Sequence, residues 1–161
     1  MNFTIRKIQK DDNVKLASII RRVLEEFNAN RPGTVYYDET TDNLFQLFQK
    51  PDTIYYVALM DDEIVGGCGI YTTEGLPDNY CELVKLYLLP HARNYGIGKI
   101  LMNKCFEFAK QKKFTHIYLE SMPELTTALI MYKKMGFKII EQRLGNACHF
   151  GCAIKMLKEV E

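Results

Sequence analysis

Apolar residues recur along this chain at two spacings, and these spacings separate its expected helices from its expected strands. Apolar positions three and four residues apart predict helices, whereas alternating or unbroken apolar runs predict strands. The expected helices cover about 12–28, 44–48, 98–112 and 124–135. The expected strands cover about 3–7, 54–60, 64–71, 80–89, 115–120, 137–143 and 148–156.

Short sequence signals add detail to these elements. Asp11-Asp12 offers an N-cap to the first long helix. Ser121, followed three positions later by Glu124, is typical of a capping box and predicts the start of the last helix. Gly66-Gly67 lies inside an expected strand and indicates a β-bulge there.

The order of these elements predicts an α/β fold. The strand at 80–89 is followed by a helix and then by the strand at 115–120, which is the arrangement of a parallel crossover. The strands at 54–60 and 64–71 are joined by Asp61-Asp62-Glu63, and the last two strands turn around Gly145-Asn146, so both pairs are expected to be antiparallel. We therefore expect one domain over 1–161, with a mixed, mostly antiparallel sheet of about seven strands flanked by about four helices.

Composition narrows the class of protein. Hydrophobic residues make up 47% and charged residues 25%, which is the balance of a globular protein. No apolar run reaches the roughly 20 residues that cross a bilayer, and the first residues do not form a signal peptide. A cytoplasmic protein without a membrane partner is therefore expected.

Charge is balanced overall but unevenly distributed. The net charge of +1 argues against nonspecific binding to nucleic acid, so no nucleic-acid partner is expected. Residues 1–80 carry 8 basic and 13 acidic side chains, whereas residues 81–161 carry 13 and 7. An anionic ligand is thus better matched to the second half and a cationic ligand to the first, although an uneven but solvated surface gives the same counts.

The five cysteines are odd in number and lie mostly in apolar runs, which is typical of buried, reduced thiols. Cys148, His149 and Cys152 have a spacing that suggests zinc. However, a fourth ligand is missing, and neighbours on a strand point to opposite faces. We expect no metal.

The most informative segment runs from Leu86 to Lys99, where an apolar strand leads through a glycine-containing turn into a basic helix. Unpaired N–H groups and the positive dipole at such a helix start favour a phosphate group. Gly96 and Gly98 permit close approach of the backbone to an anion, and Arg93 and Lys99 add charge. The spacing fits neither a P-loop nor a dinucleotide-binding fingerprint.

Two motifs in this half resemble those of the GNAT superfamily of N-acetyltransferases. The first is Arg93-x-x-Gly96-x-Gly98 at the end of an apolar strand, which resembles the family's acetyl-CoA loop. The second is Ala128-x-x-x-Tyr132-x-x-x-Gly136-Phe137, a helix that carries a tyrosine and ends in Gly-Phe. The predicted order of elements also matches, so the resemblance covers essentially the whole chain.

The resemblance implies acetyl-CoA as cosubstrate. Its pyrophosphate would be held by the backbone amides of Arg93, Asn94, Tyr95, Gly96, Ile97, Gly98 and Lys99. The main chain of Leu86 and Leu88 would hydrogen-bond the pantetheine arm like an added strand. The chain departs from the family at Leu125, where many members carry an asparagine that contacts this arm.

Two residues are candidates for the chemistry. An amine acceptor with a pKa of about 10.4 is protonated at pH 7 and must lose a proton before it attacks a thioester. Glu82, an acid within an apolar strand, resembles the catalytic glutamate of histone-acetylating members, although pairing with Lys85 would also explain it. Tyr132 is the candidate that assists the departing CoA thiolate, although its helical stripe also suits a core residue.

The predicted activity is direct transfer of an acetyl group to a primary amine on a small molecule or peptide, without a cysteine intermediate. Segments 36–39 and 72–79 could wall the acceptor site, and His149 could face it. The alternative is a non-catalytic acyl-CoA-binding or sensing module on the same fold. The last hairpin also offers an edge for pairing two copies into a homodimer.

Overall fold

Seven strands form one sheet in the computed structural model, which describes residues 2–146 and 151–161. The strands are β1 (Phe3–Lys7), β2 (Ile54–Met60), β3 (Glu63–Tyr71), β4 (Tyr80–Leu88), β5 (His116–Ser121), β6 (Lys138–Ile140) and β7 (Ile154–Glu159). Their spatial order is β1-β2-β3-β4-β5-β7-β6. Only the β4–β5 pair among them is parallel, which confirms the expected α/β class with a mostly antiparallel sheet.

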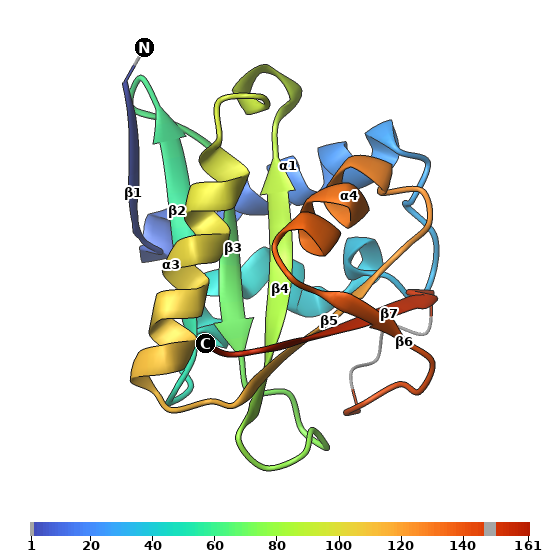
Figure 1. The fold of residues 1–161 in the computed structure, drawn as a ribbon. Helices are drawn as coiled ribbons and strands as arrows, with labels where there is room; N and C mark the ends of the chain where they lie inside the picture. The colour runs from blue at the N-terminus through green and yellow to red at the C-terminus, as the bar shows by residue number, and fades with distance from the viewer. Residues whose placement is uncertain (1, 147–150) are drawn as a thin grey trace.

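Helices cover both faces of the sheet. They are α1 (Asn13–Glu26), α2 (Leu44–Leu47), α3 (Ile97–Gln111) and α4 (Thr126–Lys134). Helices α3 and α4 lie in front of the sheet in Figure 1, and α1 passes behind it. None of the helices in the described residues combines the length and apolar character that crossing a membrane requires.

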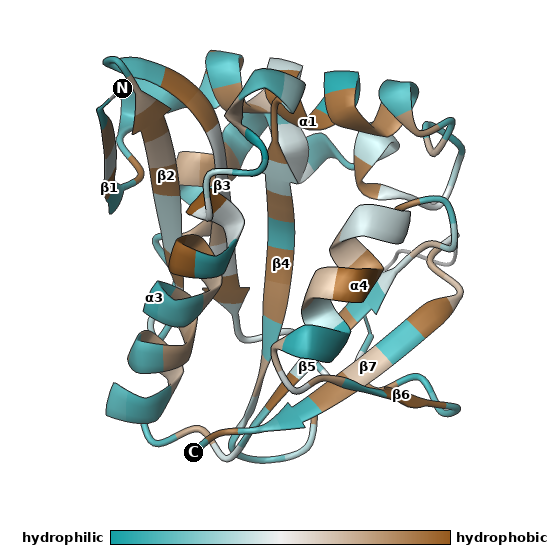
Figure 2. Cartoon of the chain, turned by 45° about the horizontal axis from the view of Figure 1, so that its top comes forward, coloured by the Kyte–Doolittle hydropathy of each residue, from teal (hydrophilic) through white to brown (hydrophobic). Residues whose placement is uncertain are grey.

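The core is divided by the sheet into two clusters. Leu101, Met102 and Cys105 of α3 pack on one face, and Leu16 and Ile20 of α1 pack on the other. Strand β4 is hydrophobic along most of its length because it lies between these two layers (Figure 2). Burial on both faces explains the unbroken apolar run that the sequence shows there.

Strand β4 loses its neighbour on one side after its first residues. The parallel ladder joins Tyr80 to His116, Cys81 to Ile117 and Glu82 to Tyr118, and it ends there. Beyond that point β5 pairs with β7 while β4 continues to Leu88. The main chain of the second half of β4 therefore borders an opening between the two strands.

A bulge interrupts the other edge of β4. On β3 the paired residues advance from Gly67 to Gly69, whereas on β4 they move from Tyr87 to Val84, so β4 contains one extra residue. Lys85 adopts a left-handed backbone conformation there, with φ of 54°. The bulge turns Lys85 toward the side of the sheet that Glu82 and Val84 face, since all three line one cavity.

Several sequence expectations need correction. The bulge expected at Gly66-Gly67 is present next to Gly66, in the ladder between β2 and β3. The bulge in β4 was not expected, because the sequence gives no signal for it. The expected capping box is wrong, because Ser121 ends β5 and α4 begins only at Thr126. Glu124 instead forms an ion pair with Arg31.

The first and last elements also differ from expectation. Asp12 stands at the N-cap of α1 without a cap hydrogen bond, because its carboxylate binds Arg6 and the Gln9 N–H instead. Strand β6 ends at Ile140, earlier than expected. The expected strand over 148–156 begins partly outside the described residues, and β7 runs over Ile154–Glu159.

Candidate functional site

The turn into α3 presents backbone N–H groups. Asn94 has φ of 69° and Gly96, the N-cap, has φ of 78°, a left-handed conformation that glycine adopts without strain. The N–H of Ile100 bonds the Gly96 carbonyl at 3.1 Å. The N–H groups before it belong to the first helical turn, which has no intrahelical acceptors for them. This is the arrangement that binds a phosphate group.

Gly98 lies where α3 packs against α4 and β4. A Cβ at this position would lie 3.2 Å from both the Cε and Sδ atoms of Met131 and 3.5 Å from the Cδ1 atom of Leu88. The missing side chain therefore lets α3 pack closely against α4 and β4. The residue matters for packing beside the opening and not only for approach to an anion.

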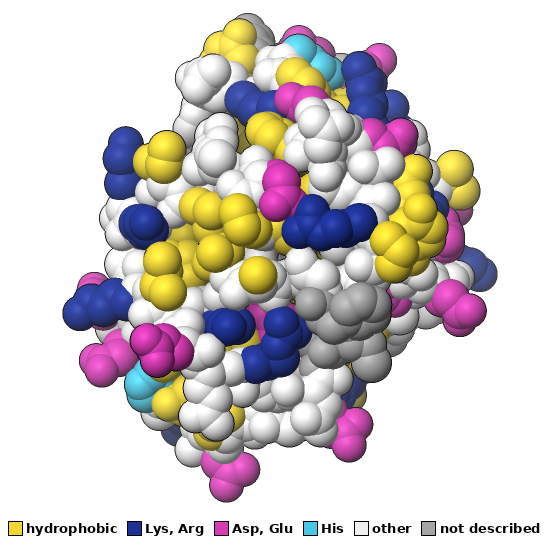
Figure 3. Space-filling model, turned by 90° about the vertical axis from the view of Figure 1, so that its right-hand side faces the viewer, with side chains coloured by type: hydrophobic (Ala, Val, Ile, Leu, Met, Phe, Trp, Pro, Cys, Tyr) yellow, Lys and Arg dark blue, Asp and Glu magenta, His cyan; other side chains and the backbone are white. Residues whose placement is uncertain are grey.

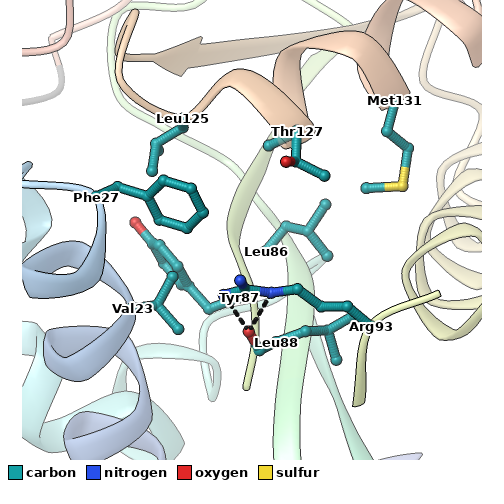
Figure 4. Close-up of a pocket in the computed structure, with 10 residues that line it drawn as sticks. Val23, Phe27, Leu86, Tyr87, Leu88, Arg93, Leu125, Thr127 and Met131 are labelled. Carbon is teal, nitrogen blue, oxygen red and sulfur yellow. Dashed lines mark hydrogen bonds between the residues drawn. The ribbon is translucent and has the colours of Figure 1, made fainter. Parts of the chain in front are cut away.

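An apolar cleft leads from this turn along β4. It lies between β4 and α4, where Leu86 and Leu88 face Leu125, Thr127 and Met131 across the opening (Figure 4). The complete lining is Val23, Phe27, Leu86, Tyr87, Leu88, Arg93, Leu125, Thr127, Ala128 and Met131. Leu125 gives an apolar side chain to this wall, and this side chain cannot donate or accept a hydrogen bond.

The guanidinium of Arg93 is committed to neighbours in the protein. Its Nε and Nη2 atoms donate to the Leu88 carbonyl at 3.1 and 2.9 Å, as the dashed lines in Figure 4 show. It also forms a bidentate pair with Glu26 at 2.7 and 2.9 Å, and this hydrogen-bonded pairing lowers the pKa of Glu26. The charge that Arg93 adds near the turn is therefore shared with the carboxylate of Glu26.

Glu82 and Tyr132, which are 50 positions apart in sequence, line the same cavity beyond the cleft. Glu82 is 4% exposed and accepts a hydrogen bond from the Thr73 hydroxyl. Tyr132 is 8% exposed, and burial raises the pKa of its hydroxyl well above the usual value, so it is protonated at neutral pH. The structure thus brings together the two catalytic candidates of the sequence.

A second cavity adjoins Glu82 on its other side. Asp38, from the segment between α1 and α2, and Thr73 and Glu74, from the β3–β4 loop, contribute to its walls. Glu82 and Lys85 line both cavities, so they stand between them. The two segments expected as acceptor walls therefore meet at the candidate base. His149 lies outside the described residues.

Sequence reasoning missed a buried acidic group next to this pair. Glu120 of β5 has a side chain that is 2% exposed, and it lines the cavity that Glu82 and Tyr132 share. It accepts a 2.6 Å hydrogen bond from Tyr118 and forms a 2.9 Å ion pair with Arg143. Glu120, like Glu82, is an acid next to apolar residues of a strand, and this pattern could have indicated it from the sequence.

The cysteines near the cavity are not prepared for nucleophilic attack. Burial raises the pKa of Cys81 to about 12 and that of Cys152 to about 11. Both are therefore thiols at neutral pH, and the thiolate is the reactive form. Within residues 2–146 and 151–161, no three metal-binding side chains come together; Cys148 and His149 lie outside these residues.

The face shown in Figure 3 carries mixed charge. Basic and acidic side chains alternate over it, and apolar side chains are visible between them. No continuous basic stripe of the kind that follows a nucleic-acid backbone is visible among its coloured residues.

Comparisons with known proteins agree with this geometry. The model of the acetyltransferase (GNAT) family matches residues 20–137. The chain is 34% identical over 157 residues to the uncharacterised N-acetyltransferase YjgM of Escherichia coli (strain K12), covering 97% of this chain and 94% of that protein.

Solved structures share the fold at lower identity. A GNAT-family acetyltransferase from Staphylococcus aureus Mu50 matches with a TM-score of 0.83 at 20% identity, covering 99% of this chain and 100% of that one. The PaiA N-acetyltransferase of Thermoplasma acidophilum, solved in complex with coenzyme A, matches with a TM-score of 0.75 at 21% identity and covers 99% of each chain.

Proposed function

The chain belongs to the acetyltransferase (GNAT) family, and from this premise we propose that it transfers the acetyl group of acetyl-CoA directly to a primary amine. The observation that carries the proposal is the opening between β4 and β5. It has backbone N–H groups at one end, in the turn into α3, and buried Glu82 at the other. A long ligand with a phosphate group and a reactive end matches this arrangement.

The residues along the opening suit acetyl-CoA, which supplies an acetyl group activated as a thioester. The pyrophosphate would be held by the amides from Asn94 to Lys99, and the pantetheine arm by the main chain of Leu86 and Leu88. The Arg93 amide, which the motif also implies, already donates to the Pro90 carbonyl at 3.2 Å. The Leu88 carbonyl already accepts from Arg93 in this structure. Arg93 therefore competes with the pantetheine arm for the Leu88 carbonyl but not for the main chain of Leu86.

Glu82 is the proposed general base. The acceptor nitrogen forms a bond with the acetyl carbon after its proton passes to the Glu82 carboxylate, directly or through one water. The Thr73 hydroxyl orients that carboxylate by its hydrogen bond. Glu82 suits this role because it lies at the boundary of the two cavities, one beside the cleft and one open toward an acceptor.

Tyr132 is proposed to assist the leaving sulfur. Its hydroxyl is protonated at neutral pH because burial raises its pKa, so it can donate a hydrogen bond as the carbon–sulfur bond breaks. CoA leaves as a thiolate that gains a proton from solvent. A hydrogen bond is favoured over full proton transfer, because a tyrosine with a raised pKa is a weak acid toward a thiolate.

Calorimetric titration with acetyl-CoA, followed by a panel of primary amines with detection of released CoA thiol, tests this proposal. We expect binding and turnover of at least one amine. Binding with neither turnover nor slow hydrolysis of acetyl-CoA would indicate the non-catalytic binding module. Absence of binding would contradict both functions.

A further inference from the structure

Lys85 is a lysine in a buried part of β4, and its ammonium has no partner among the described residues. Lys85 is only 9% exposed. Within the described part of the chain, its ammonium makes no ion pair and no hydrogen bond. Burial lowers its pKa, and the charges of Asp38 and Glu82 offset this effect only in part. A buried ammonium normally requires an anion or hydrogen-bond acceptors.

The backbone holds Lys85 in this position at some cost. A lysine with φ of 54° is strained, and without the bulge strand alternation would turn its side chain to the other face of β4. The Lys85 carbonyl accepts a 2.8 Å hydrogen bond from the buried Tyr55 hydroxyl, which fixes the bulge. The fold therefore keeps a cation in the cavity on the side of Glu82.

A second donor without a partner lies in the same cavity. The Ser121 Oγ atom is buried, in a residue that is 4% exposed, and it forms no hydrogen bond in the described residues. Ser121, Lys85 and Glu82 line this cavity together. The nearby Glu120 carboxylate is already bound by Arg143 and Tyr118, so it does not serve as the counterion of Lys85.

We propose that Lys85, assisted by Ser121, binds a carboxylate of the acceptor, and that the acceptor is therefore an amino acid or another small amine that carries a carboxylate. This inference rests on the proposed acetyltransferase function and specifies its substrate class. A carboxylate offers several lone pairs to an ammonium and a hydroxyl. With the carboxylate on Lys85, the amine of the same molecule is directed toward Glu82.

Charge favours such a substrate over a polyamine or another purely cationic amine. The walls of the second cavity carry three acids, Asp38, Glu74 and Glu82, which attract an ammonium group. They also carry Lys50, whose ammonium donates a hydrogen bond to the Thr72 carbonyl. Lys85, on the same wall, repels a purely cationic acceptor but attracts its carboxylate-bearing counterpart. A zwitterion satisfies both signs of charge at once.

Matched substrate pairs test the inference on the unaltered protein. Each of the common amino acids is compared with its carboxamide and with the amine that lacks the carboxyl group, by initial rates of CoA thiol release. We expect the preferred acceptor to exceed its carboxamide in kcat/KM by roughly 10- to 100-fold, because the site loses a charged hydrogen bond with the carboxamide. Equal or better turnover of the carboxamide or of the decarboxylated amine overturns the inference.

Variants then assign the preference to Lys85. Lys85→Met should raise the KM for the amino acid and leave the kcat/KM of the carboxamide nearly unchanged, while Lys85→Arg should keep part of the preference. Lys104→Met is the matched control. Lys104 is on α3, its ammonium lies over the Tyr56 ring of β2, and it lines neither cavity. If Lys85→Met affects acid and amide equally, Lys85 does not bind the carboxylate.

The two proposals fail in distinguishable ways. If acetyl-CoA binds and amines are acetylated, but no acceptor with a carboxylate is preferred over its carboxamide, only the proposed substrate class is overturned. Acetyl-CoA that does not bind in calorimetry overturns the acetyltransferase proposal, and the inference that rests on it falls too.

Discussion

The hydroxyl of Tyr55 on β2 donates a 2.8 Å hydrogen bond to the main-chain carbonyl of Lys85 on β4, although β3 lies between these two strands. The Tyr55 ring crosses β3 where two glycines leave room for it. A Cβ at Gly67 would lie 2.5 Å from the ring, and a Cβ at Gly69 would lie 2.7 Å from it. These glycines and Tyr55 together hold the β4 bulge in place.

We expect Tyr55→Phe to destabilise the protein by roughly 1–3 kcal/mol, because it leaves the buried Lys85 carbonyl without its donor. The kcat should also fall, since the bulge positions side chains in the cavity. Urea unfolding and initial rates measure the two effects. Tyr56→Phe, a neighbour on β2 that faces α3, is the control and should change neither. Equal stability of the two variants would contradict the role of Tyr55.

The strands were predictable because most of them are short apolar runs bounded by polar or turn residues, and Ile54–Met60, which ends at Asp61-Asp62, matches the prediction to the residue. The β4 bulge was not, because its cause is a tyrosine two strands away. The same limit applies to Arg93, whose partner Glu26 lies 67 residues earlier. A motif indicates where the backbone turns, but it does not show which side chain from a distant helix occupies the available donors.

The candidate site was predictable in outline for a similar reason. Glu82 stood out as an acid in an apolar run, and Tyr132 through a motif, and the fold places both at one cavity. That Lys85 and Ser121 have donors without partners among residues 2–146 and 151–161 was not predictable, because hydrogen-bond partners depend on the three-dimensional structure. The spacing of Ser121 to Glu124 is that of a capping box, but Ser121 lies in β5 and Glu124 pairs with Arg31.

Glu82→Gln should lower turnover most strongly near neutral pH. The deficit should shrink as the pH approaches the pKa of the acceptor amine, because a deprotonated amine no longer needs the base. A pH–rate profile of both proteins measures this, and affinity for acetyl-CoA should stay nearly the same. Glu63→Gln, on the exposed start of β3, is the control. If the pH–rate profiles of Glu82→Gln and the unaltered protein have the same shape at all pH values, another group removes the proton.

Gly98→Val should weaken acetyl-CoA binding by forcing Met131 into the cleft. The reason is the 3.2 Å distance from a Cβ at position 98 to the Met131 thioether. If this is the cause, Met131→Ala combined with Gly98→Val should recover much of the affinity in calorimetry, whereas Met131→Ala alone should change it little. Lack of recovery in the double variant would mean that the valine blocks the ligand directly.

Asp12 should contribute stability that depends on pH. Burial alone would raise its pKa, but hydrogen bonds from Arg6 and the Gln9 N–H, together with the Arg6 charge, outweigh this and lower it. A lowered folded-state pKa means that the contribution is complete above the unfolded value of about 3.9, and is lost as the pH falls through the folded-state pKa. The stabilised form is therefore the ionised carboxylate.

Asp12→Asn should accordingly lower the Tm at pH 7, and the difference from the unaltered protein should shrink below about pH 4. Thermal melts between pH 7 and pH 3 measure the difference. Asp11→Asn, at an exposed neighbour, should have little effect at any pH. A deficit that persists unchanged at acidic pH would show that the asparagine acts through packing and not through lost charge.

Tyr132→Phe isolates the hydroxyl that we place beside the leaving sulfur. The ring packs edge-on against Phe137, with centroids 5.9 Å apart, and phenylalanine keeps that contact. If the hydroxyl acts mainly as charge develops on sulfur, kcat should fall while acetyl-CoA affinity stays the same. We expect a loss near the lower end of about 10²–10⁴-fold, because the raised pKa of Tyr132 favours a hydrogen bond over full proton transfer.

Steady-state rates and a thermal melt of each protein make this comparison decisive. Tyr80→Phe, a tyrosine at the start of β4 that stacks on His116, is the control and should keep full activity. A Tyr132→Phe protein that melts normally and is fully active would make Tyr132 a core residue, with solvent alone protonating the thiolate. A thiolate with a higher pKa is a poorer leaving group and depends more on assistance. If the hydroxyl contacts the sulfur, the loss of kcat in Tyr132→Phe should therefore be larger with acetyl thioesters whose thiol has a higher pKa than CoA.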